Sequence, residues 1–215
     1  THDVAKNRHV ETKGKSYLRD LGITDAGGNV LKSAQDKYRQ IDKYIDIVGA
    51  LLPAGKRYNI ADMGAGKGYL TFALYDYLHG KNIDARVTGV EYRKDLVDLC
   101  NKIARGSGFD KLEFVQGAID GFDASGMNVL IALHACDTAT DDAIAKGIKA
   151  GAELIVVAPC CHKQIRREME SAAKNDTLDF ILKYGTLLER QAEMVTDAMR
   201  GLLLEHAGYA VKLFE

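Results

Sequence analysis

The sequence contains no tryptophan, two prolines and four cysteines among its 215 residues. Four cysteines are too few for a disulfide framework in a chain of this length, and Cys160 and Cys161 are adjacent, which favours a reducing, cytoplasmic location. No apolar run approaches the roughly 18 residues of a membrane span, so no membrane partner is expected. Lysine plus arginine (29) nearly balances aspartate plus glutamate (30), which excludes a global attraction to polyanions.

Apolar residues make up 47% and charged residues 27% of the chain, which are ordinary globular values. The length fits one large domain better than two. Residues 1–33 are polar, turn-rich and modestly basic, so we expect an N-terminal basic extension exposed to solvent, with the folded domain at residues 34–215.

Short apolar runs alternate with helical patterns from residue 58 onward. This strict alternation of strands and helices predicts a Rossmann-like, doubly wound α/β fold with a mostly parallel sheet. An amphipathic helix, capped by Ser33 and ended by Pro53, is expected before it. The expected strands are Tyr58–Met63, Arg86–Glu91, Leu112–Gln116, Asn128–Leu133, Leu154–Ala158 and, last in the chain, Tyr209–Phe214. The expected helices between them are Tyr69–Leu78, Asp95–Arg105, Thr138–Ala150, Gln164–Ala173 and a stretch from Leu178 to His206 interrupted near Gly185.

A glycine-rich loop follows the first expected strand, in the run Asp62-Met63-Gly64-Ala65-Gly66-Lys67-Gly68. Such glycines let the backbone turn sharply and approach a ligand at the start of the next helix. The spacing differs from the dinucleotide pattern G-x-G-x-x-G, and the lysine lacks the Ser or Thr that follows it in a P-loop. The pattern is that of S-adenosylmethionine enzymes, so it predicts this cofactor, bound by Asp62, Gly64, Gly66 and Gly68.

An acidic residue closes the second expected strand. Glu91 is placed to accept both ribose hydroxyls of the cofactor, with Tyr92 beside it. The end of the third strand, at Gly117 and Ala118, is expected to hold the adenine, with Asp120 as a further candidate. Lys67 has three open roles: contact with the methionine carboxylate, contact with a substrate phosphate, or an outward position in solvent.

Polar and thiol side chains follow the fourth and fifth expected strands, in Leu133-His134-Ala135-Cys136-Asp137 and Pro159-Cys160-Cys161-His162-Lys163. Neighbouring strands of such a sheet bring these loops together beside the cofactor's methyl group. One interpretation is a general base or a group that orients the nucleophile. A second is zinc, but no C-x-x-C pair is present, so no metal is expected. A third is that the cysteines only pack. The candidate catalytic residues are His134, Asp137, His162 and Lys163, and His134 is also expected to contact the cofactor.

Two groups of basic residues suggest an RNA partner despite the neutral overall charge. Each residue taken singly also suits a solvated surface, but together they are placed to track a phosphate backbone. They are Lys6, Arg8, Lys13 and Lys15 near the N-terminus, and Arg166 and Arg167 after the fifth strand.

From Ser33 to Phe214 the sequence resembles class I S-adenosylmethionine-dependent methyltransferases. It looks more narrowly like the family that includes the tRNA acceptor-stem 2′-O-methyltransferase and the methyltransferase region of a glutathione S-transferase C-terminal-domain protein. The resemblance rests on the glycine loop, Glu91, and the His-Ala-Cys-Asp and Pro-Cys-Cys-His motifs. It implies cofactor contacts at Asp62, Gly64, Gly66 and Glu91, and a substrate side formed by the two later motifs.

The chain departs from that pattern in three ways. It lacks the Cys/His zinc modules of the tRNA enzyme, and it lacks the Asp-Pro-Pro-Tyr type of run used on exocyclic base amines. Only one strand of the usual final hairpin is evident, so that hairpin is expected to be incomplete. We therefore expect a methyltransferase that acts on RNA (tRNA or rRNA) at a hydroxyl or ring nitrogen. The alternatives are a small-molecule or protein methyltransferase, or a non-catalytic module that binds S-adenosylmethionine.

Overall fold

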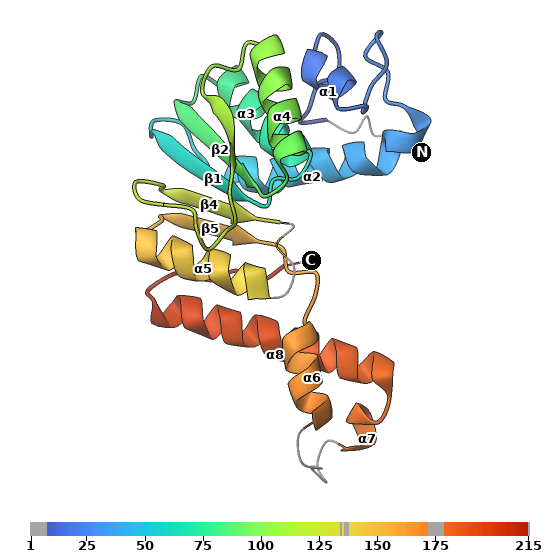
Figure 1. Cartoon of the computed structure of the whole chain (residues 1–215), viewed down its shortest axis with the longest axis vertical. Coiled ribbons are helices and arrows are strands. Elements are labelled where there is room, and N and C mark those ends of the chain that lie inside the picture. The colour runs from blue at the N-terminus through green and yellow to red at the C-terminus, as the bar shows by residue number, and fades with distance from the viewer. Residues whose placement is uncertain (1–7, 134, 136–137, 172–178, 215) are drawn as a thin grey trace, which may run out of the picture.

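A five-stranded parallel sheet forms the centre of the computed structural model, which describes residues 8–133, 135, 138–171 and 179–214 (Figure 1). The strands lie in the order β3-β2-β1-β4-β5, and every neighbouring pair is parallel. From β1 the chain adds β2 and β3 on one side of the sheet and then β4 and β5 on the other side. Ligands bind at the point between β1 and β4 where this change occurs in sheets of this kind. The strands are β1 (Tyr58–Met63), β2 (Ala85–Glu91), β3 (Leu112–Gln116), β4 (Val129–Ala132) and β5 (Leu154–Val157).

Helices cover both faces of the sheet, because side chains alternate along each strand. Ile60 packs in the cluster that contains α1 to α4, whereas Ala61 and Met63 pack in the cluster that contains α5. The expected doubly wound α/β fold is therefore confirmed. The helices are α1 (Ser16–Asp20), the 3-10 helix η1 (Lys32–Ala34), α2 (Gln35–Ala50), α3 (Tyr69–Gly80), α4 (Lys94–Gly106), α5 (Thr138–Ala150), α6 (Lys163–Ser171), α7 (Asp179–Leu182) and α8 (Gly185–His206).

The N-terminal segment packs into the core. Tyr17, Leu18 and Ile23 are buried, and the Tyr17 ring stacks on Phe72 of α3 with 5.8 Å between centroids. The expectation of a solvated arm is therefore wrong for the described part of this segment, because its few apolar side chains fill a gap over α3 and α4. The domain boundary at residue 34 stays a prediction.

Two local expectations are corrected. Ser33 lies inside η1 and does not cap α2, whose preceding residue, Ala34, makes no side-chain cap. Residues 209–214 form no strand: the Tyr209 hydroxyl donates to the Ala152 carbonyl at 2.8 Å, and Val211 lies against Gly201 of α8. An extended apolar segment that packs on a helix has the same sequence pattern as a strand.

The C-terminal helices extend from the body of the fold. Figure 1 shows that α6, α7 and the first part of α8 lie away from the sheet, while the rest of α8 runs beside α5. The interruption expected near Gly185 is present, between α7 and α8. Among the described residues, no helix combines the length and the apolar character that crossing a membrane requires.

Candidate functional site

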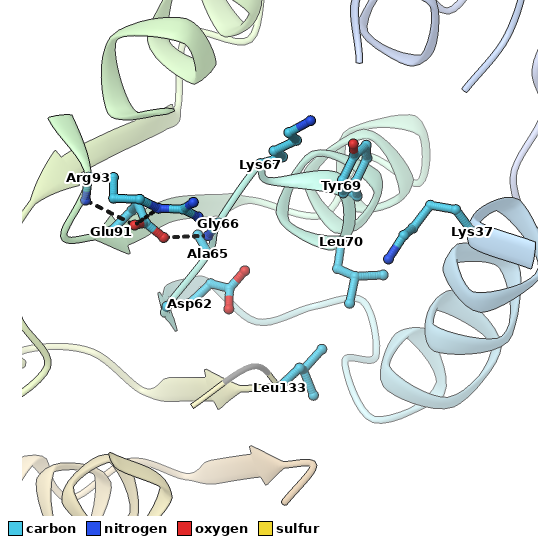
Figure 2. Close-up of a pocket in the computed structure, with 11 residues that line it drawn as sticks. Lys37, Asp62, Ala65, Gly66, Lys67, Tyr69, Leu70, Glu91, Arg93 and Leu133 are labelled. Atoms are coloured by element: carbon cyan, nitrogen blue, oxygen red, sulfur yellow. Dashed lines mark hydrogen bonds and ion pairs between the residues drawn. The ribbon is translucent and has the colours of Figure 1, made fainter. Parts of the chain in front are cut away.

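A cavity of about 320 Å³ opens at the carboxyl edge of the sheet, where the loops after β1, β2 and β4 meet. Figure 2 shows Asp62, Leu70 and Lys37 around a common space between the glycine loop and α2, while Lys67 points away from it. The cavity is lined by Lys37, Asp62, Gly64, Ala65, Gly66, Lys67, Tyr69, Leu70, Glu91, Arg93 and Leu133.

The glycine loop has the backbone that its sequence predicts. Gly64, Gly66 and Gly68 have φ angles of 75°, 60° and 71°, in the left-handed region that favours glycine. Gly68 directly precedes α3, and a Cβ there would lie 2.9 Å from the Phe114 ring. The loop can therefore hold this shape and keep α3 close to the sheet only with glycine at that position.

Glu91 joins the end of β2 to the glycine loop. Its Oε2 accepts a hydrogen bond from the Gly66 amide at 2.9 Å, and its Oε1 accepts from the Arg93 amide at 2.9 Å and from Arg93 Nε at 3.1 Å. Burial opposes ionisation, but these hydrogen bonds outweigh it and hold the pKa of Glu91 below its ordinary value. The carboxylate is thus charged, and one of its roughly four acceptor sites is left for a ligand hydroxyl.

Asp62 is the most deeply buried acid of the cavity. Its Oδ2 accepts a hydrogen bond from Thr71 Oγ1 at 2.5 Å. Loss of solvation raises the pKa of Asp62 to about 6, although the Thr71 hydrogen bond opposes this shift. A carboxylate with so little solvent gains most from a cationic ligand, such as the ammonium group of an amino acid.

Three cations line the same cavity. Lys37 comes from the first turn of α2, and Figure 2 shows its Nζ pointing into the space that Asp62 faces. Lys67 is exposed and points away from Asp62 in the same view. Arg93 pairs with Glu91.

The residues predicted to hold the adenine lie at the same edge of the sheet but outside the lining of this cavity. The Gly117 amide donates a hydrogen bond to the Glu91 backbone carbonyl at 3.1 Å, which fixes the end of β3 beside Glu91. Tyr92, Ala118 and Asp120 are exposed nearby in sequence. Their roles in cofactor binding stay predictions. The role of Gly68, which directly precedes α3 and packs against Phe114, also stays a prediction.

The predicted substrate side is described in part. His134, Cys136 and Asp137 lie outside the described residues. His162 is buried, and its Nδ1 lies 4.0 Å from Asp197 Oδ1 and has no hydrogen-bond partner among the described residues. Lys163 is exposed at the start of α6, and the Cys160 and Cys161 sulfurs are 3.7 Å apart. No cluster of metal-ligating side chains occurs among the described residues.

A charged cluster that the sequence did not reveal adjoins His162. The buried Arg200 of α8 makes two hydrogen bonds to Asp141 of α5, from Nε at 2.7 Å and from NH2 at 3.1 Å. Its NH1 lies 3.2 Å from Asp197, the acid that faces His162. The cluster thus links α8 to the start of α5, which follows the predicted His-Ala-Cys-Asp motif.

Most of the described basic residues proposed for RNA are paired with carboxylates. Arg8 lies 3.6 Å from Asp42, and Lys15 lies 2.7 Å from Asp76. Arg166 pairs with Glu170 and Glu189. Lys13 and Arg167 are exposed, and Lys6 lies outside the described residues.

Several residues that line the cavity were not predicted from the sequence. Arg93 could have been predicted, because it is a basic residue only two positions after Glu91. Tyr69 and Leu70 could also have been predicted to line the cavity, because they are the first two residues of the helix that follows the glycine loop. Lys37 had no local signal, because its place depends on how α2 packs against α3.

Comparison with known proteins agrees with the site. A family model described as a methyltransferase domain matches residues 36–168, more than half of the chain. The chain is 28% identical over 135 residues to the protein-lysine N-methyltransferase EFM4 of Saccharomyces cerevisiae, over 62% of this chain and 56% of that protein. The chain thus spans little more than half the length of that relative.

Two solved structures illustrate the similarity in three dimensions. An RNA methyltransferase from Salinibacter ruber in complex with S-adenosyl-L-homocysteine is 21% identical, with a TM-score of 0.43, over 55% of this chain and 73% of that one. A tRNA (uracil-54, C5)-methyltransferase from Pyrococcus abyssi, also in complex with S-adenosyl-L-homocysteine, is 15% identical, with a TM-score of 0.43, over 55% of this chain and 29% of that one.

The residues of the cavity fit the cofactor of this family. Asp62 suits its ammonium group, Glu91 has one acceptor site for a ribose hydroxyl and not the two that the sequence predicted, because Gly66 and Arg93 occupy the others, and the Gly64–Gly68 turn lets the backbone approach the ligand. The charges in the cavity therefore match a ligand with an ammonium group at its amino acid end and an uncharged sugar. The chain belongs to the methyltransferase domain family and contains a class I S-adenosylmethionine-dependent methyltransferase domain.

Proposed function

We propose that this enzyme transfers a methyl group to the side-chain amine of a lysine in a protein substrate. The observation that carries the proposal is the pairing of Arg8, Lys15 and Arg166 with carboxylates, because it removes most of the described positive charge that RNA would need. The similarity to a protein-lysine methyltransferase supports the same acceptor.

Exposed apolar side chains on the C-terminal helices also favour a protein acceptor. Phe180, Tyr184, Leu187 and Met194 are 63%, 55%, 42% and 67% exposed along α7 and α8. Apolar side chains gathered on a surface suit contact with another protein more than contact with a polyanion. These helices follow β5 in the chain, and α7 and the first part of α8 extend away from the sheet (Figure 1).

Methyl transfer to a lysine needs the amine to be aligned with the cofactor's methyl group, and it needs one group that accepts a proton from the amine. When bound, the cofactor supplies an electrophilic methyl group on a sulfonium. Transfer to a lysine would form a carbon–nitrogen bond as the carbon–sulfur bond breaks, with the electron pair of that bond passing to sulfur. The acceptor must first lose a proton, and our candidate base is His162, whose Nδ1 lies 4.0 Å from Asp197 Oδ1. Asp62 and Glu91 hold the methyl donor in line with the acceptor.

Methylation of RNA is the second candidate, because Lys13, Lys163 and Arg167 are exposed and none of them pairs with a carboxylate in the part of the chain that the structure describes. The roles of Lys163, His134 and Asp137 in catalysis stay predictions for either acceptor.

Tritiated S-adenosylmethionine separates the two acceptors. The enzyme is incubated with the cofactor and a total cell extract, and aliquots are then treated with ribonuclease or with proteinase. We expect label that survives ribonuclease, is lost with proteinase, and yields methyl-lysine on acid hydrolysis. Glu91→Gln is the control that should lower labelling strongly when the cofactor is kept at a limiting concentration. Label removed by ribonuclease would replace the protein acceptor with RNA.

A further inference from the structure

We propose that Lys37 of α2 binds the carboxylate of the cofactor's methionine half, opposite Asp62, and so makes α2 one wall of the cofactor site. The proposal concerns the cofactor alone and holds whichever acceptor is methylated. It assigns to Lys37 a contact that the sequence alone had left open for Lys67.

The position of Lys37 supports this assignment. It lies in the first turn of α2, 25 residues before the glycine loop begins at Asp62, yet it lines the same cavity. Its Nζ lies 5.3 Å from the centre of the Tyr69 ring and 2.9 Å from Gln40 Oε1, and its side chain is half-buried. Tyr69 and Gln40 thus hold the ammonium group at the mouth of the site, so binding a ligand costs less side-chain entropy than it would for a free lysine.

The other two cations of the cavity are less suited to this contact. Arg93 donates to Glu91 through both its backbone amide and its Nε, so its charge is directed at the ribose acid. Lys67 is exposed and points away from Asp62 in Figure 2. Lys37 is therefore the lining cation that faces the same space as Asp62.

The charges complete the argument. An amino acid group carries an ammonium and a carboxylate on one carbon, so a site for it needs an anion and a cation on facing walls. Asp62 at the end of β1 supplies the anion, and Lys37 supplies the cation from α2. A charge-assisted pair in a partly buried site is stronger than one at an exposed surface.

Three ligands test the contact by calorimetry. S-adenosylhomocysteine carries both the amine and the carboxylate, decarboxylated S-adenosylmethionine keeps only the amine, and 5′-methylthioadenosine has neither. We expect Lys37→Met to weaken binding of S-adenosylhomocysteine by about 10- to 100-fold, the effect of one hydrogen bond between charged groups. Binding of the other two ligands should change by less than about twofold, because neither has a carboxylate to lose.

Lys43→Met is the matched control, since it removes an exposed lysine of the same helix that does not line the cavity, and it should leave all three affinities unchanged. Lys67→Met tests the competing assignment. Circular dichroism and the midpoint of thermal unfolding establish that each variant is folded. Equal weakening of all three ligands by Lys37→Met would show that Lys37 only shapes the cavity, and no weakening of S-adenosylhomocysteine would show that it does not touch the carboxylate. A loss of S-adenosylhomocysteine binding in Lys67→Met instead would return the contact to the loop. Each of these three outcomes overturns the proposal.

Discussion

The carboxylate of Glu91 accepts a hydrogen bond from the backbone amide of Gly66 at 2.9 Å. One acid therefore closes β2, fixes the shape of the glycine loop and is placed to meet a ribose. The loop geometry and the ribose contact depend on the same side chain, so a change at Glu91 should affect both.

Glu91→Gln should weaken binding of S-adenosylhomocysteine and of 5′-methylthioadenosine alike, by about 10- to 100-fold. Both ligands carry the ribose, and the amide has one acceptor oxygen where the carboxylate has two. Calorimetry with the two ligands measures the change. Glu113→Gln, an exposed acid on the neighbouring strand β3, is the control and should bind as the wild type does. Weakening of only one ligand would contradict a ribose contact.

Asp62→Asn should stabilise the ligand-free protein at neutral pH while it weakens cofactor binding. Burial raises the folded-state pKa of Asp62 to about 6 from 3.8, so the folded protein binds this proton more tightly than the unfolded chain does. Stability is therefore lost as the pH rises from about 4 to 6, and the full penalty above pH 6 is on the order of 3 kcal/mol. Asparagine removes the charge and still accepts the Thr71 hydrogen bond.

Urea unfolding at pH 8 and pH 4 checks this prediction. The variant should exceed the wild type in free energy of unfolding at pH 8, and the two should converge at pH 4. A variant that is less stable than the wild type at pH 8 would show that the charge of Asp62 is satisfied within the folded protein.

Cofactor affinity should also depend on pH through Asp62. The ionised carboxylate attracts the ammonium group, so affinity for S-adenosylhomocysteine should be constant above pH 7 and fall by about tenfold per pH unit well below pH 6. Glu91 does not contribute in this range, because its pKa lies below the ordinary value. In Asp62→Asn the affinity should be low at every pH between 5 and 8. A wild-type affinity that does not change between pH 5 and pH 7 would exclude this role.

The parts of the site that sequence predicts are those set by position along one strand and its loop. Asp62, Gly64, Gly66 and Glu91 all lie at strand ends, and a parallel sheet brings such ends to one edge whatever the helices do. The alternation of strands and helices predicts the fold for the same reason, since it fixes which elements are neighbours.

The parts that sequence misses depend on packing between distant segments. Helix periodicity predicts which face of α2 is buried, but not that Lys37 at its first turn meets the glycine loop. Tyr17 and Leu18 lie in a helix of only five residues, which is too short to establish a helical period, although both are buried. The sequence does not indicate that Arg200 is buried, and only the approach of α8 to α5 gives it Asp141.

The packing of the N-terminal segment should contribute measurably to stability. Tyr17→Ala should lower the free energy of unfolding by about 3–5 kcal/mol, because it empties the space over Phe72 and Phe109. Tyr17→Phe keeps the ring and loses only the 3.3 Å hydrogen bond to Asp76, so it should cost about 1 kcal/mol. Arg19→Ala, at an exposed position of the same helix, is the control for urea unfolding. If Tyr17→Ala has wild-type stability, the segment contributes nothing to the core.

The pair formed by Asp141 and Arg200 should hold α8 against α5. Asp141→Asn removes the charge of one of the two described carboxylates that pair with Arg200, while the other, Asp197, is unchanged. We therefore expect a loss of about 1–3 kcal/mol in the free energy of unfolding. Asp142→Asn, the exposed neighbour, is the matched control and should change stability by less than about 0.5 kcal/mol. Hydrogen exchange should rise in α8 in the first variant and not in the second. Equal stability and exchange in the two variants would mean that apolar packing, and not this ion pair, fixes α8.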